Sequence, residues 1–116
     1  MTEERRLELL KVASSASFTH QISHDKDYWF FNDGKEHRYL KLEPGGYIHR
    51  HSDKAGWRHF YVLQTNPDSL FYVEGEEYHL DQGGIYEMDG RLEHWAVNNG
   101  DCDRINFIDL KVTVGG

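Results

Sequence analysis

The chain of 116 residues has one cysteine, two prolines and no long apolar run. The single cysteine, Cys102, cannot form a disulfide within the chain, which excludes a disulfide scaffold and fits a reducing compartment. No run of about 18 apolar residues is present, so we expect no membrane-spanning helix. The first residues also lack the apolar stretch of a secretory signal. These absences together predict a cytoplasmic protein that does not enter a membrane.

Basic residues are also in short supply. The sequence has 13 Lys and Arg against 20 Asp and Glu, which gives a net charge of −7. Because nucleic-acid phosphates bind basic surfaces, this balance argues against a nucleic-acid partner. The sequence leaves the oligomeric state undetermined.

Aromatic residues are abundant, at 14% of the chain, although only 38% of the residues are hydrophobic. Large rings fill a small core with few residues, and 116 residues suffice for one core. We therefore expect a single domain over residues 1–116. No internal repeat or low-complexity segment divides it.

The pattern along the chain predicts one short helix followed only by strands. Residues 3–14 form the helix, with Thr2 as its N-cap and Leu7, Leu10 and either Val12 or Ala13 on its apolar face. The expected strands are residues 28–31, 36–42, 47–51, 57–64, 69–73, 77–80, 85–88, 94–98 and 104–112. Many short strands separated by Gly and Asn turns indicate a mainly β sandwich or barrel. Within this pattern, Asn98 is expected to bind backbone amides at a turn.

His51-Ser52-Asp53 and the later His94 form the most informative pattern in the sequence. Two imidazoles and one carboxylate on one side of a metal leave coordination positions open, as in non-haem Fe(II) oxygenases. Residues two apart in a strand share a face, so His51 and Asp53 look into a barrel if the strand continues to Asp53. His49 is in phase with His51 and competes as a ligand. Arg104 follows His94 by ten residues, where it is able to anchor an anionic co-substrate.

The sequence around these residues resembles the aspartyl/asparaginyl β-hydroxylase family, which is similar to bacterial free-proline hydroxylases. The resemblance rests on several segments with matching order and spacing: His51-Ser52-Asp53, Arg58, residues 62–67 (VLQTNP), residues 83–89 (GGIYEMD), His94 with Asn98, and residues 104–109 (RINFID). It covers about residues 46–112. The fold it implies is a double-stranded β-helix, a jelly-roll or cupin-like barrel, with its core over those residues.

The same resemblance implies an Fe(II)- and 2-oxoglutarate-dependent dioxygenase. His51, Asp53 and His94 would bind the metal, and Arg104, helped by Arg58, would bind 2-oxoglutarate. The implied reaction consumes O2 and 2-oxoglutarate and hydroxylates a C–H bond. The implied substrate is either a small-molecule amino acid or an aspartyl, asparaginyl or prolyl residue in a peptide or protein.

One position departs from the family pattern, and two other functions compete with a hydroxylase. Family members often carry a His two residues after the first Arg, where this chain has Phe60. A metal-binding cupin, catalytic or binding a small ligand, would use His49, His51 and His94, but the Glu that cupins carry after their His pair is missing. A non-catalytic barrel that serves binding or assembly would need neither the metal ligands nor the two arginines.

Overall fold

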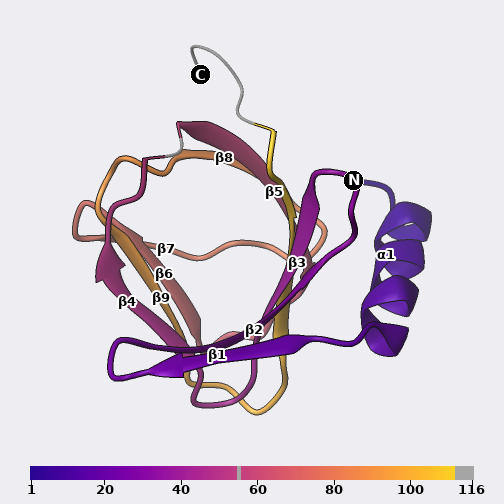
Figure 1. Ribbon diagram of the computed structural model, residues 1–116, viewed down its shortest axis with the longest axis horizontal. Helices are drawn as coiled ribbons and strands as arrows, with labels where there is room; N and C mark the ends of the chain where they lie inside the picture. Colours follow the sequence, from indigo (N-terminus) through magenta and orange to yellow (C-terminus); the bar gives the residue numbers. More distant parts are fainter. Residues whose placement is uncertain (55, 112–116) are drawn as a thin grey trace.

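The computed structural model describes residues 1–54 and 56–111, which form one helix and ten strands in a curled antiparallel sheet (Figure 1). The elements are α1 (Glu3–Ser15), β1 (Thr19–Ser23), β2 (Lys26–Asn32), β3 (His37–Leu42), β4 (Tyr47–His51), β5 (Trp57–Gln64), β6 (Ser69–Val73), β7 (Glu76–Tyr78), β8 (Ile85–Asp89), β9 (His94–Asn98) and β10 (Arg104–Asp109). Within this part of the chain no helix combines the length and apolarity needed to cross a membrane. The predicted fold class, a mainly β barrel with one N-terminal helix, is confirmed.

The strand order brings distant segments together around one interior. The order is β7-β6-β9-β4-β2-β3-β10-β5-β8, with β1 added on β2, and every pairing is antiparallel. Strands β4, β6 and β9 therefore form one wall, and β3, β10, β5 and β8 form the wall that faces it (Figure 1). Side chains that alternate inward from both walls line a common cavity.

The helix packs on the outside of this barrel, against a cluster that includes Leu63. Leu9 and Ala13 are its buried apolar residues, whereas Leu7 and Val12 are 52% and 44% exposed. The predicted apolar face was therefore wrong at Leu7, and of the two alternatives for its last position Ala13 rather than Val12 is buried. The reason is Arg6, which occupies the third inward position and donates a hydrogen bond to the Leu63 carbonyl at 2.8 Å. A charged residue on the buried face conceals the helical periodicity.

The predicted strands match most of the sheet, with differences at the ends of segments. Strand β1 was not predicted, because four of its five residues are exposed and no alternation marks it. The strand expected over 77–80 covers Glu76–Tyr78, and β10 ends at Asp109. The sheet also includes β1 to β3, which precede the expected core of 46–112; residue 112 itself lies outside the described residues.

Asn98 ties the two walls together at one end of the barrel. Its side chain is fully buried, and its amide nitrogen donates to the carbonyls of Leu42 at 2.8 Å and Cys102 at 2.9 Å. Its amide oxygen accepts hydrogen bonds from Asn66 Nδ2 (3.0 Å), Ser69 Oγ (3.3 Å) and the Gly100 amide (3.0 Å). The expected capping role is thus extended to a buried node that joins β3, β6 and β9.

Replacing Asn98 by alanine should destabilise the protein by about 3 kcal/mol, since several buried polar groups would lose their partner at once. Chemical denaturation measures this change in the free energy of unfolding. Asn99→Ala provides the control, because Asn99 is exposed in the same turn and such substitutions change stability by less than about 0.5 kcal/mol. Equal stability of the two variants would contradict the role of Asn98.

Candidate metal centre

His51 and His94 face each other across the paired strands β4 and β9. Their Cα atoms are register partners, and their ring centroids lie 4.3 Å apart. His51 ends β4, while His94 begins β9 and is 8% exposed. Antiparallel pairing thus brings together two histidines separated by more than forty residues of sequence.

A β-bulge separates His49 from this pair. Ile48 pairs with Ala96 and His51 pairs with His94, so β4 contains one more residue than β9 over this interval. An extra residue breaks the two-residue alternation, and the expectation that His49 and His51 share a phase was therefore wrong. His49 lines the cavity, but it is outside the one group of His, Cys, Asp and Glu ligand atoms that meets metal-site spacing in the described residues.

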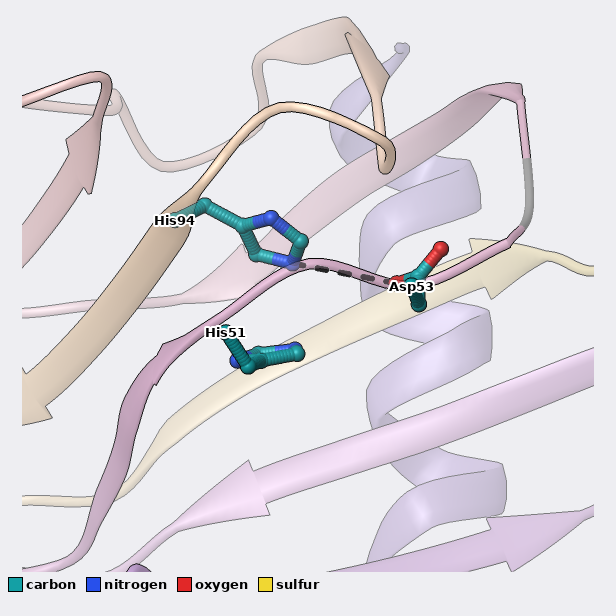
Figure 2. Close-up of side chains that lie close together, drawn as sticks. All are labelled: His51, Asp53 and His94. Atoms are coloured by element: carbon teal, nitrogen blue, oxygen red, sulfur yellow. Dashed lines mark ion pairs between the residues drawn. The ribbon is translucent and has the colours of Figure 1, made fainter.

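Asp53 reaches the two histidines from a loop. Strand β4 ends at His51 and does not continue to Asp53. The position of Asp53 is therefore not set by the strand alternation on which the sequence prediction depended. Its backbone N–H donates to the Gly90 carbonyl at 2.9 Å, which ties this loop to the segment that leads into β9. One carboxylate oxygen lies 3.9 Å from His94 Nε2, and the ligand atoms of His51, Asp53 and His94 all lie within 4.8 Å of one another (Figure 2).

Backbone hydrogen bonds fix the tautomers of both histidines. His51 Nδ1 is 2.8 Å from the His49 carbonyl, and His94 Nδ1 is 2.7 Å from the Leu92 carbonyl. A carbonyl oxygen only accepts, so each Nδ1 carries the proton, and in the neutral ring Nε2 then presents a lone pair. Such a bond from the other ring nitrogen is typical of metal-ligating histidine. The donor set of two imidazoles and a carboxylate therefore fits a divalent metal ion.

The environment of His94 favours the neutral imidazole that binds metals. Burial lowers its pKa below the usual 6.5, and the neighbouring His51 acts in the same direction. The Leu92 carbonyl and Asp53 act in the opposite direction, but the net shift remains downward. At neutral pH the Nε2 lone pair of His94 is accordingly free of a proton.

The three residues border a cavity of about 440 Å³ inside the barrel. Arg104 from β10 and Arg58 from β5 line the same cavity, so the structure brings together all five residues that the sequence singled out. The metal group lies on the wall of β4 and β9, and the two arginines lie on the facing wall. A ligand in the cavity would therefore lie between the metal group and the guanidinium groups.

Arg104 is a buried cation without an acidic partner. It is only 4% exposed, and burial lowers its pKa to about 10, so it stays charged at neutral pH. Its guanidinium lies 5.7 Å from the centre of the Phe71 ring. Within residues 1–54 and 56–111, no carboxylate oxygen lies within 4.0 Å of its nitrogens. Because an unpaired buried charge is costly, this arrangement favours an anionic ligand.

Arg58 and Phe60 occupy successive inward positions on β5. Arg58 Nε is buried with no hydrogen-bond partner in the described chain. Phe60 is 7% exposed and packs on Phe71 and Tyr86, with ring centroids 6.0 and 5.8 Å away. The position where relatives often carry His is thus part of the aromatic packing here, and it offers no polar contact to a ligand.

The sequence did not identify several further polar residues that line the cavity, and three of them are Lys26, Arg38 and Asn106. The sequence feature that would reveal them is an even spacing, along the same strand, from a residue that faces inward. Asn106 lies two residues after Arg104 on β10, and Arg38 precedes the buried Leu42 by four residues on β3. Locating the inward face of each strand would have found two of the three.

Several solved structures share this fold at low sequence identity. A cupin-like protein from Thermotoga maritima matches with a TM-score of 0.61 and 20% identity, over 88% of this chain and 84% of that chain. A protein described as a predicted oxalate decarboxylase, also from Thermotoga maritima, matches with a TM-score of 0.59 and 17% identity, over 84% of this chain and 96% of that chain. A chain in the structure of Drosophila melanogaster CENP-C bound to CAL1 matches with a TM-score of 0.53 and 19% identity, over 90% and 92%.

These neighbours establish a cupin-type barrel but no shared activity, since they range from a predicted oxalate decarboxylase to a chain of the CENP-C complex with CAL1. A search among curated proteins gave no match. The family model described as aspartyl/asparaginyl beta-hydroxylase matches residues 11–111, nearly the whole chain. This span includes the metal group, Arg58 and Arg104, in agreement with the resemblance seen in the sequence. The chain belongs to the aspartyl/asparaginyl β-hydroxylase family.

Proposed function

We propose that this protein is an Fe(II)- and 2-oxoglutarate-dependent dioxygenase that hydroxylates an amino acid or an aspartyl, asparaginyl or prolyl residue. One observation carries the proposal: a two-His, one-carboxylate group and a buried, unpaired arginine face the same cavity. The metal group alone suits many metalloproteins. The addition of a buried guanidinium favours an anionic co-substrate that bridges the two walls.

The residues of the chain have separate tasks in this proposal. His51 and His94 offer Nε2 and Asp53 offers a carboxylate oxygen, so Fe(II) keeps open positions for other ligands. Arg104 binds the distal carboxylate of 2-oxoglutarate, which a planar guanidinium grips through two N–H groups. Arg58 lines the same cavity and supplies a second positive charge there.

The barrel contributes burial and order. When bound, Fe(II) together with 2-oxoglutarate and O2 supplies the oxidising power for C–H hydroxylation. The cavity lining includes apolar side chains, among them Leu42, Phe60 and Phe71. This apolar surface lowers the local dielectric constant and so strengthens the electrostatic attraction between Arg104 and a carboxylate. The Nδ1 hydrogen bonds of both histidines hold their rings in the ligating orientation.

The visible spectrum of the anaerobic protein tests this proposal. A weak metal-to-ligand charge-transfer band is expected only when both Fe(II) and 2-oxoglutarate are present. Succinate should then form on admission of O2 with a suitable substrate. Absence of the band at saturating Fe(II) and 2-oxoglutarate would contradict the proposal. Metal binding that persists without Asp53 but requires His49 would instead favour the cupin alternative.

A further inference from the structure

We propose that the substrate is a small molecule with a free carboxylate, such as an unblocked amino acid, and that Arg38 binds this carboxylate. The inference rests on the proposed function, because it assigns a second anion site beside the co-substrate site. It narrows the substrate class from free or polypeptide-borne residues to free ones. Three features of the cavity carry it: its charge, the two depths of its arginines, and the way Arg38 is held.

The cavity is cationic although the chain is acidic. Its described lining includes five cationic side chains, Lys26, Arg38, Arg50, Arg58 and Arg104, but only two acidic ones, Asp25 and Asp53. Asp53 belongs to the metal group, and Arg50 pairs with Glu93 at 3.5 Å. A protein of net charge −7 thus has an excess of positive charge around this one cavity. This concentration exceeds what a single dicarboxylate co-substrate requires.

Arg104 and Arg38 lie at different depths on neighbouring strands. Arg104 pairs with Leu42, near the Asn98 node, whereas Arg38 pairs with Ile108. Four residues separate Leu42 from Arg38, which is roughly 13 Å of strand. The co-substrate that Arg104 holds in the deep part of the cavity therefore leaves Arg38 for another ligand.

Arg38 lies toward the same end of the barrel as the metal group. Asn98 ends β9 and Leu42 ends β3, and their hydrogen bond joins these two ends. His94 is the first residue of β9 and Arg38 is the second residue of β3, so both lie toward the opposite end of the barrel. One wall there carries the metal ligands, and the facing wall carries Arg38. A small substrate bound to Arg38 would place its carbon skeleton between the two walls, beside the metal group.

The Arg38 guanidinium is oriented but not neutralised. Its Nε donates to Asn32 Oδ1 at 2.8 Å, and its Cζ lies over the Phe30 ring, 4.8 Å from the centroid. In the described part of the chain, no carboxylate lies within 4.0 Å of it. These contacts leave its terminal N–H groups for a planar anion, and such pre-organisation favours bidentate carboxylate binding.

The size of the cavity fits a free amino acid. About 440 Å³ is at the low end of the range for small-molecule sites, roughly 300–1,000 Å³. An asparaginyl or prolyl residue inside a polypeptide has no carboxylate to offer Arg38, and an aspartyl residue has only its side-chain carboxylate. A free amino acid has a free α-carboxylate.

Paired ligands that differ only in the carboxylate test this assignment. L-proline, L-aspartate and L-asparagine are compared with their α-amides, in wild type and in the variant Arg38→Met. Binding is measured in metal-free protein from the Arg38 Nε–H resonance and backbone amide shifts, and substrate KM is measured from succinate formation. At least one free acid should bind wild type about tenfold or more tighter than its amide, and R38M should lose that difference.

The controls separate this site from the co-substrate site and from folding. R38M should retain the charge-transfer band and the 2-oxoglutarate affinity, because Arg104 is untouched. Arg38→Lys should recover part of the acid preference. Arg5→Met removes the same charge from the exposed face of α1 and should change none of these values. If R38M does not fold, Asn32→Ala tests the same guanidinium, and it should weaken acid binding several-fold.

Two results would overturn the inference: an α-amide or a peptide that binds as tightly as its free acid, or an R38M variant that binds free acids as tightly as wild type. Loss of the charge-transfer band in wild type would count against the proposed function alone, since the titration of the metal-free protein still measures the Arg38 site.

Discussion

Replacing His94 by alanine is expected to remove Fe(II) binding and to lower turnover by more than about 100-fold. Partners of metal ligands alone cost about 10–100-fold when mutated, so loss of a ligand should cost more. His94 is the most buried ligand, and its Nε2 faces both the other imidazole and the carboxylate. Metal titration by calorimetry and the charge-transfer band measure the loss directly.

Two further variants decide which residues complete the metal group. Asp53→Ala should behave like His94→Ala, because it removes the one carboxylate of the group. His49→Ala should retain metal affinity within a few-fold, since the β-bulge keeps His49 out of the group. The reverse outcome, with metal lost in the His49 variant and kept in the Asp53 variant, would assign the ligands of a cupin and reject the dioxygenase proposal.

Replacing Arg104 by methionine should make the metal-free, ligand-free protein more stable while it weakens 2-oxoglutarate binding. A well-packed apolar side chain in place of a buried charge commonly adds about 1–3 kcal/mol of stability. Loss of the charged partner should cost 2-oxoglutarate about 2–5 kcal/mol of binding free energy, or roughly 30-fold or more. The same substitution thus has opposite effects on folding and on binding.

Denaturation with and without 2-oxoglutarate measures both effects. At about 100 times its dissociation constant, 2-oxoglutarate should add about 2.7 kcal/mol to the stability of the Fe(II)-loaded wild type. The same concentration should add little to Arg104→Met. Arg104→Lys keeps the positive charge but lacks the planar guanidinium. Its affinity for 2-oxoglutarate should therefore fall between those of wild type and Arg104→Met. An Arg104→Met variant that is strongly destabilised and still binds 2-oxoglutarate would show a structural role instead.

The family assignment and the fold class were predictable because they depend on local patterns. Short alternating strands with Gly and Asn turns indicated a β barrel, and His51, Asp53, His94, Arg58 and Arg104 appeared with recognisable spacing. The strand register, however, was not predictable. The bulge between Ile48 and His51 exists only in the pairing of β4 with its partner strand β9. This bulge separates His49 from His51.

The sequence by itself determined which residue types are present and in what order, and this suffices to indicate two imidazoles, a carboxylate and two arginines. Only the tertiary structure decided which of them share a space. Whether an arginine lacks an acidic partner depends on every element packed around it, so the isolation of Arg104 and the position of Arg38 across from the metal group emerged only when both walls of the barrel were in place. For the same reason, the buried face of the helix could not be predicted from the sequence. Arg6 faces inward because the Leu63 carbonyl, 57 residues away in the sequence, accepts its hydrogen bond.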